Sequence, residues 1–199
     1  MIFSRKNITA VLIFLFISDI LLSVKKYNYV GTAACSLCHS NDSIGNQKAV
    51  WDKSPHSKAF KILQTDTANM IASKYGISDP AGDPKCLKCH TTGGGKNELT
   101  AGEGVGCEAC HGPGDGYQSF ENHASFLSRE NAYVKAVNNG MYPIIGINHI
   151  KNREKLCRKC HSTDPAVRLC LPENREKQKE DVLSLDAIAN FIYPHPVVR

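Results

Sequence analysis

Hydrophobic residues are unevenly distributed along this chain of 199 residues. Residues 7–24, just after Arg5 and Lys6, form a largely apolar run that only Asp19 interrupts. Further along, amphipathic segments alternate with stretches rich in glycine and proline, which favour loops. This pattern predicts helices joined by loops, with the helices over residues 43–54, 56–76, 116–140 and 173–193.

The expected helix boundaries rest on local signals. Ser43 is a candidate N-cap, Pro55 interrupts the first helical segment, and Gly76 ends the second. The sequence Asn138-Asn139-Gly140 is a typical helix end. Residues 91–106 are glycine-rich and are expected to form a flexible excursion or short β-hairpin, and residues 141–150 an extended link.

The N-terminal run is typical of an export signal, with a basic start and an apolar centre. Residues 1–30 are therefore expected to be a signal peptide, or else an uncleaved anchor that tethers the protein to the outer face of a membrane. Residues 31–199 are expected to form one domain, since about 170 residues suit a single core. No second hydrophobic run follows, so the leader is the expected membrane contact.

The body of the chain contains four copies of C-x-x-C-H, and this motif is the attachment signature of c-type haem. Its two sulfurs form thioethers with the haem vinyl groups, and the next histidine binds the iron as proximal ligand. The cofactor-binding cysteines are Cys35, Cys38, Cys86, Cys89, Cys107, Cys110, Cys157 and Cys160. The proximal histidines are His39, His90, His111 and His161. The sequence thus predicts four covalently bound haem c groups, each with one iron.

Other uses of paired cysteines explain this pattern less well. Structural zinc sites use C-x-x-C pairs but do not require a histidine directly after each pair. A thioredoxin-like redox pair needs a βαβ context, which no copy has. A disulfide framework would leave the four histidines as coincidence. Haem is therefore the favoured interpretation, and haem attachment requires export to the periplasm or an equivalent compartment.

Composition indicates that the haems would supply the core. Aromatic residues make up 8% of the chain, and glycine and proline gather around the motifs, as in "GVGCEACHGPG" at 104–114. Such a chain has little apolar packing of its own, so the apoprotein is expected to hold little stable structure. The formal charge is +5, mostly from the leader, and ionised haem propionates offset the rest. A nearly neutral holoprotein gives no support for nucleic-acid binding.

Iron with one histidine can take a second ligand from elsewhere in the chain. Four histidines lie outside the motifs, and His56, His123 and His149 are the expected distal ligands. His195 lies between two prolines of the tail and is not expected to bind iron. Three distal ligands for four irons leave one iron five-coordinate. Methionine is scarce, which favours bis-histidine haems of low potential.

The chain resembles the tetrahaem cytochrome c-554 family of bacterial ammonia oxidation. The resemblance rests on "WDKSPHSKA", with Trp51 and His56, on "DPKCLKCH", on "GVGCEACHGPG", and on the positions of His123 and His149. It implies a mainly α-helical fold: a small multihaem cytochrome with helices and loops around four closely packed haems, and little β structure. It also implies that the haem of His90 is the five-coordinate one and that His123 serves the first haem.

The same resemblance implies a periplasmic electron carrier. Its expected partners are an octahaem hydroxylamine oxidoreductase as donor and a membrane cytochrome or quinone reductase as acceptor. The alternative is an enzyme that reduces nitric oxide at the open iron of His90, but no proton-donor constellation can be placed there from sequence. Cys170 is left without a mate once the motif cysteines are used, and is expected to be a buried structural thiol.

Overall fold

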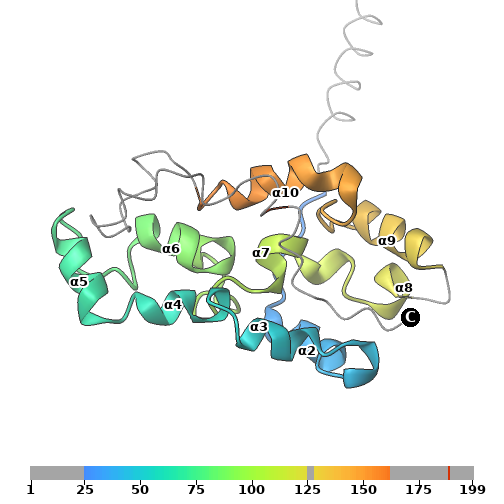
Figure 1. Ribbon diagram of the computed structural model, residues 1–199, viewed down its shortest axis with the longest axis horizontal. Coiled ribbons are helices and arrows are strands. Elements are labelled where there is room, and N and C mark those ends of the chain that lie inside the picture. The colour runs from blue at the N-terminus through green and yellow to red at the C-terminus, as the bar shows by residue number, and fades with distance from the viewer. Residues whose placement is uncertain (1–24, 125–127, 162–187, 189–199) are drawn as a thin grey trace, which may run out of the picture.

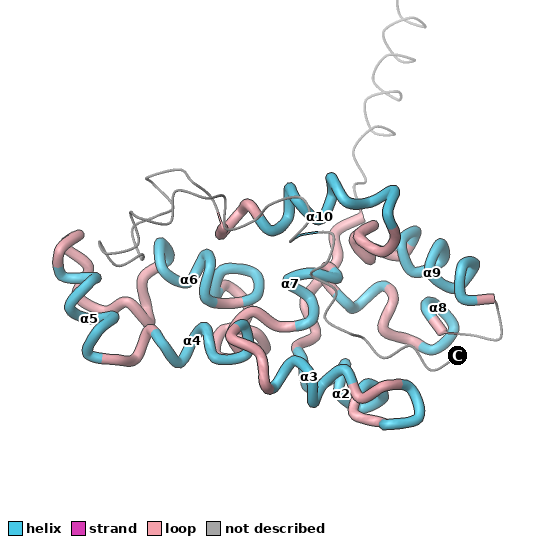
Figure 2. The backbone as a smooth tube through the Cα atoms, viewed as in Figure 1, coloured by secondary structure: helices cyan, strands magenta, loops and turns pink. Residues whose placement is uncertain are grey.

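The computed structural model describes residues 25–124, 128–161 and 188, and these consist of helices and loops without a strand (Figures 1 and 2). This confirms the expected mainly α-helical class. The α-helices are α2 (Thr32–His39), α3 (Gln47–Asp52), α4 (Ala59–Ile62), α5 (Asp66–Ser73), α6 (Pro84–His90), α7 (Cys107–His111), α8 (Phe120–His123), α9 (Arg129–Asn138) and α10 (Ile150–Cys157). The 3₁₀ turns are η1 (Asp42–Ile44), η2 (His56–Lys58), η3 (Thr92–Gly95), η4 (Gly114–Gly116) and η5 (Ile147–His149).

The short helices form a row rather than a bundle. Figure 1 shows α5 and α4 at one end, α8 and α9 at the other, and α6 and α7 between them, with α10 along one side. Helix α2 contacts α3 and α7, α6 contacts α4 and η3, and α8 packs on α9. Two of the motif helices, α6 and α7, lie between the two ends, while α2 and α10 lie along opposite sides.

The helices between the first two motifs are shorter than the sequence pattern predicts. Ser43 is not an N-cap: it lies inside η1, and Asn46 caps α3 by accepting a hydrogen bond from the Ala49 amide. The expected helix over 56–76 is broken, because the Thr65 hydroxyl accepts a hydrogen bond from the Ala68 amide and starts a new helix there.

The loops also differ from the expected ones. The β-hairpin over 91–106 is wrong: Gly93, Gly94 and Gly95 all have positive φ, which no strand allows, and they form η3 and turns. The segment 116–140 begins at the last residue of η4 and contains α8 and α9, and α9 ends at Asn139-Gly140 as expected. The link over 141–150 is not extended throughout, since η5 leads directly into α10.

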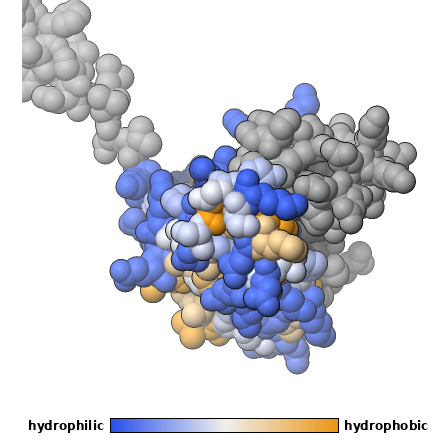
Figure 3. All heavy atoms as spheres, turned by 90° about the vertical axis from the view of Figure 1, so that its left-hand side faces the viewer, coloured by the Kyte–Doolittle hydropathy of each residue, from blue (hydrophilic) through white to orange (hydrophobic). Residues whose placement is uncertain are grey.

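The apolar core of the described residues is small. Its main cluster consists of Leu63, Ala72, Ile77 and Cys86 beneath α4–α6. Meanwhile several large hydrophobic side chains are exposed: Leu37 of the first motif is 87% exposed, Leu99 65% and Met70 61%. Figure 3, which looks onto the α4–α6 end, shows hydrophobic residues at the surface among hydrophilic ones. The polypeptide thus leaves apolar surface that a prosthetic group could cover.

Some expectations fall outside the described residues: most of the leader, the helix over 173–193 (except for Ile188), Cys170 and His195. Within the residues that are described, no helix is both long enough and apolar enough to cross a membrane.

Candidate haem-binding sites

Each C-x-x-C-H motif lies on or at the end of a short helix. The first three motifs end α2, α6 and α7 at their histidines, while α10 ends at Cys157 and the fourth motif continues into the following turn. Residues three apart in a helix lie on the same face, so both sulfurs of a motif point to one side. This is the local geometry that two thioether bonds to neighbouring edges of one ring require.

The helices bring the motifs together in two pairs. The first and third motifs meet where the Cys35 thiol hydrogen-bonds the Cys107 thiol, a contact that raises the pKa of Cys35. The second and fourth meet through the Cys89 and Cys160 thiols, which lie 4.0 Å and 3.9 Å from the Lys159 and Lys88 carbonyl oxygens. All eight motif cysteines are free of disulfides. Sequence gives no information on this pairing.

His39 of the first motif faces His123 at the end of α8. Their ring centroids are 6.1 Å apart and the rings are inclined by only 27°. Two imidazoles bound to opposite sides of one metal ion, each about 2 Å from it, have centroids about 6 Å apart. The separation therefore fits an iron atom between the two rings.

Hydrogen bonds at Nδ1 orient both of these rings. His39 Nδ1 lies 3.0 Å from Gln47 Oε1, and His123 Nδ1 lies 3.2 Å from the Ser119 carbonyl oxygen. Because an oxygen acceptor there requires a proton on Nδ1, Nε2 is left with its lone pair for a metal. Tyr117 packs edge-on against His123 at 6.0 Å. Gln47, Ser119 and this role of Tyr117 were not found from sequence, because no motif marks such orienting groups.

His161 of the fourth motif faces His56 in the same way. Their centroids are 6.0 Å apart, with an interplanar angle of 64°. Burial, and secondly the charge of His161, lowers the pKa of His56, and burial lowers that of His161. Both shifts favour the neutral imidazole, which is the form that binds iron.

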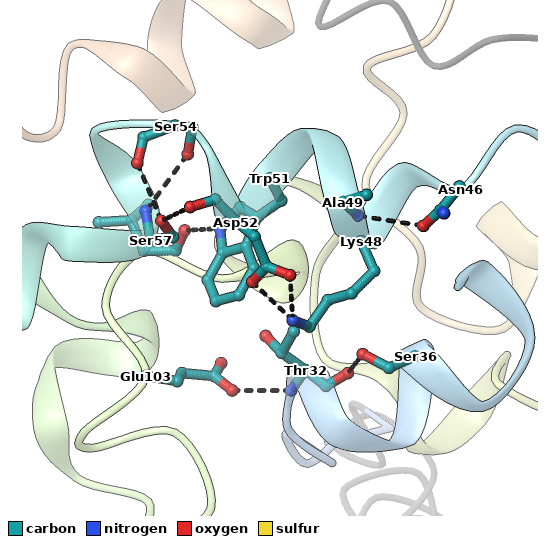
Figure 4. Close-up of polar contacts among 11 residues, drawn as sticks. Thr32, Ser36, Asn46, Lys48, Ala49, Trp51, Asp52, Ser54, Ser57 and Glu103 are labelled. Carbon is teal, nitrogen blue, oxygen red and sulfur yellow. Dashed lines mark hydrogen bonds and ion pairs between the residues drawn. The ribbon is translucent and has the colours of Figure 1, made fainter. Parts of the chain in front are cut away.

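The glycine-rich segment before the third motif holds His56 in place. The Val105 amide donates to the His56 carbonyl oxygen at 3.0 Å, and Trp51 Nε1 donates to the Val105 carbonyl oxygen at 2.8 Å. Gly104 has φ 82°, and a Cβ there would lie 2.6 Å from the His56 oxygen, so this position requires glycine. Figure 4 shows Trp51 on α3, above Glu103 and Thr32.

The other three candidate ligands lie in different surroundings. His90 Nδ1 is 2.8 Å from the Ala59 carbonyl oxygen, which again leaves Nε2 for a metal. The His111 carbonyl oxygen accepts from the Tyr142 amide at 2.9 Å, which fixes the end of α7. His149 lines a cavity of about 200 Å³ with Tyr133, Val134, Val137, Asn138 and Pro143, and Tyr133 lies edge-on to it at 6.2 Å.

Comparison with known proteins finds similarity over part of the chain. Residues 34–112 match the model of the family described as cytochrome c554 and c-prime. Cytochrome c-554 of Nitrosomonas europaea is 33% identical over 104 residues, which cover 45% of this chain and 40% of that relative. The chain thus aligns with less than half of the relative's length. No solved structure matches it. Residues 34–112, which carry the first three motifs, are thus similar to the cytochrome c-554 family of c-type cytochromes.

Proposed function

We propose that this protein is an exported tetrahaem electron carrier of nitrogen metabolism. Its proposed donor is an octahaem enzyme of the hydroxylamine oxidoreductase type, and its proposed acceptor is a membrane cytochrome or quinone reductase. The observation that carries the proposal is the pair of facing imidazoles on His39 and His123, at the separation that one iron between them requires. Each bound haem supplies one-electron exchange between Fe(III) and Fe(II).

The proposed ligand sets follow from the geometry and from the number of histidines. His39 with His123, and His161 with His56, hold the irons of the first and fourth motifs, as the two ring separations support. His149 then serves His111, because it is the remaining expected distal ligand. His90 is left as the single protein ligand of the second haem.

A carrier is favoured over a nitric oxide reductase by the surroundings of the second motif. The cluster next to α6 consists of Leu63, Ala72, Ile77 and Cys86, with Phe60, Ala81 and Leu87 packed against it. These apolar side chains supply no proton on the side of the second motif that they cover, whereas reduction of a nitrogen oxide consumes protons.

The proposed domain begins a few residues earlier than residue 31. The Asp115 amide donates to the Asn28 carbonyl oxygen at 3.2 Å, and Asn28 Nδ2 donates to Asp115 Oδ2 at 2.9 Å. Tyr27 packs closely on Gly116 and Gly140. These contacts favour a leader that ends before Tyr27, so that the following residues stay with the body.

Four covalent haems can be counted by intact-protein mass spectrometry. We expect the mature protein to carry four haem masses, because all four motifs have free cysteines on a short helix or the turn that follows one. A protein with fewer haems and intact motif thiols would contradict the count. The same measurement shows whether the leader has been removed and at which residue.

The exposed lysines on and next to the helices of the second and fourth motifs suit an acidic redox partner. Five exposed lysines lie there: Lys85, Lys88, Lys151, Lys155 and Lys159. On α10, Glu154 pairs with Arg158 at 2.8 Å. Complementary charge of this kind mainly accelerates association and is weakened by salt.

Charge reversal on α10 tests both the partner and the function. We expect Lys151→Glu with Lys155→Glu to slow stopped-flow reduction by a hydroxylamine oxidoreductase roughly ten-fold at low salt, with the difference lost at high salt. Lys53→Glu with Lys61→Glu, on α3–α4, is the matched control for net charge. Equal slowing in both variants would contradict this docking face. Nitric oxide turnover faster than exchange with the partner would instead support the reductase.

A further inference from the structure

Glu108 is a completely buried carboxylate inside the third haem-binding motif, between Cys107 and Cys110. Its side chain accepts hydrogen bonds from three backbone amides. The Gly31 amide lies 2.8 Å from Oε2, the Gly114 amide 2.6 Å from Oε1, and the Val30 amide 3.0 Å and 3.2 Å from the two oxygens. Every one of these partners donates, which is the arrangement that suits a carboxylate rather than a carboxylic acid.

The backbone is shaped to bring these amides close. Gly31 has φ 84°, and a Cβ on Gly114 would lie 2.9 Å from Glu108 Oε1. Glycine at both positions lets the chain approach the carboxylate from opposite sides. Glu108 thereby joins residues 30–31, the helix α7 and the turn that follows it.

Glu103 adds a second carboxylate at the same place. Its Oε2 accepts from the Thr32 amide at 2.7 Å, at the start of α2 (Figure 4). Burial raises the pKa of Glu103. The raised pKa makes Glu103 the weaker source of negative charge, although the Thr32 amide stabilises its ionised form. Two acidic side chains thus lie between the first and third motifs, whereas the intervening residues of the fourth motif are Arg158 and Lys159 and the second motif contributes Lys88.

We propose that Glu108 is a positioning residue that also lowers the reduction potential of the haem bound at Cys107–His111. The inference rests on the proposed attachment of haem at that motif. An oxidised haem carries one more positive charge than a reduced one, so a nearby negative charge favours the oxidised form. Because Glu108 is buried, water screens its charge poorly, and the effect exceeds that of a surface carboxylate. The lysines and arginine at the second and fourth motifs act in the opposite direction.

Glu108→Gln removes the charge and nearly preserves the shape of the side chain. In a redox titration followed optically and by electron paramagnetic resonance, we expect one of the four midpoint potentials to rise. At a fixed potential, the ratio of oxidised to reduced haem should fall at least ten-fold. This corresponds to a rise of at least 59 mV in the midpoint potential of a one-electron couple. Glu130→Gln, at an exposed position on α9, is the matched control and should leave all four midpoints unchanged. Glu108→Asp retains the charge and should return the midpoint toward its original value.

Haem content is measured by mass in every variant. A Glu108→Gln protein with four haems and four unchanged midpoints would overturn the inference. If that variant holds fewer haems, Glu103→Gln provides the test: it should raise the same midpoint by a smaller amount, and an unchanged midpoint overturns the inference. Neither negative result contradicts the proposed function. A wild-type protein without haem at the third motif would contradict the proposed function itself.

Discussion

Replacing both Cys107 and Cys110 with serine is expected to yield an exported chain that does not fold around its first and third motifs. The described residues outside the α4–α6 cluster have little apolar core of their own: their buried hydrophobic side chains are Tyr117, Ala132, Ala136 and Ile188. Leu37 of the first motif is almost fully exposed in the polypeptide alone. A haem at the third motif would supply the missing apolar surface.

The size of the effect follows from buried area. An aromatic side chain buries about 200 Å², so a ring system equal to two of them contributes about 10 kcal/mol at ~25 cal/mol per Å². Domains of this size are stable by only about 5–15 kcal/mol, so the loss of one haem removes most or all of the stability. The cluster of Leu63, Ala72, Ile77 and Cys86 belongs to α4–α6 and does not cover the first and third motifs.

Circular dichroism, thermal unfolding and limited proteolysis measure the outcome. The double-serine protein should lose helical signal, unfold without a cooperative transition, and be cut between α7 and α9. Cys170→Ser is the matched control, because that cysteine belongs to no motif and should leave the haem content and melting curve unchanged. A double-serine protein that kept three haems and a cooperative transition near the original temperature would contradict the idea that haem forms this core.

The positions of the helices could be predicted from sequence better than their lengths. Pro55 and Asn139-Gly140 ended helices as expected, because proline and glycine act locally. The break at Thr65 was missed although Thr-Asp is a typical N-cap sequence, because the apolar residues on both sides suggested one continuous helix. The glycines at 93–95 likewise take positive φ, which a hairpin pattern does not reveal.

The candidate ligands could be chosen from sequence, but which two histidines would bind the same iron could not. The count of spare histidines left open which iron each would serve. His56 lies 105 residues from His161 in the chain, so no local sequence signal marks the two rings as neighbours. Glu108 looked like an ordinary acidic residue for the same reason, since its three amide partners come from segments on both sides of the motif.

His123→Ala is expected to convert the haem of the first motif from low-spin to high-spin. The ring separation of 6.1 Å places His123 where the second axial ligand of the iron bound by His39 would lie. Removing that imidazole leaves a single protein ligand, and the iron then resembles the one proposed for His90. The electron paramagnetic resonance spectrum should lose one low-spin signal and gain high-spin intensity of about one haem equivalent.

Two further variants separate ligation from packing. His123→Met keeps a ligand, so it should remain low-spin while its midpoint potential rises, because methionine ligation raises the potential of a histidine-bound haem. Added imidazole should restore the low-spin signal in His123→Ala, which a protein that had merely lost its fold could not do. His56→Ala should give the same change at the haem of His161.

His195→Ala is the matched control, since it removes an imidazole that is not expected to bind iron. It should leave every low-spin signal in place. A new high-spin haem in His195→Ala would assign the fourth distal ligand to the tail and leave no open iron at His90. An unchanged spectrum in His123→Ala would mean that the ring facing His39 is held there by Ser119 and Tyr117 alone, and that another residue completes the first haem.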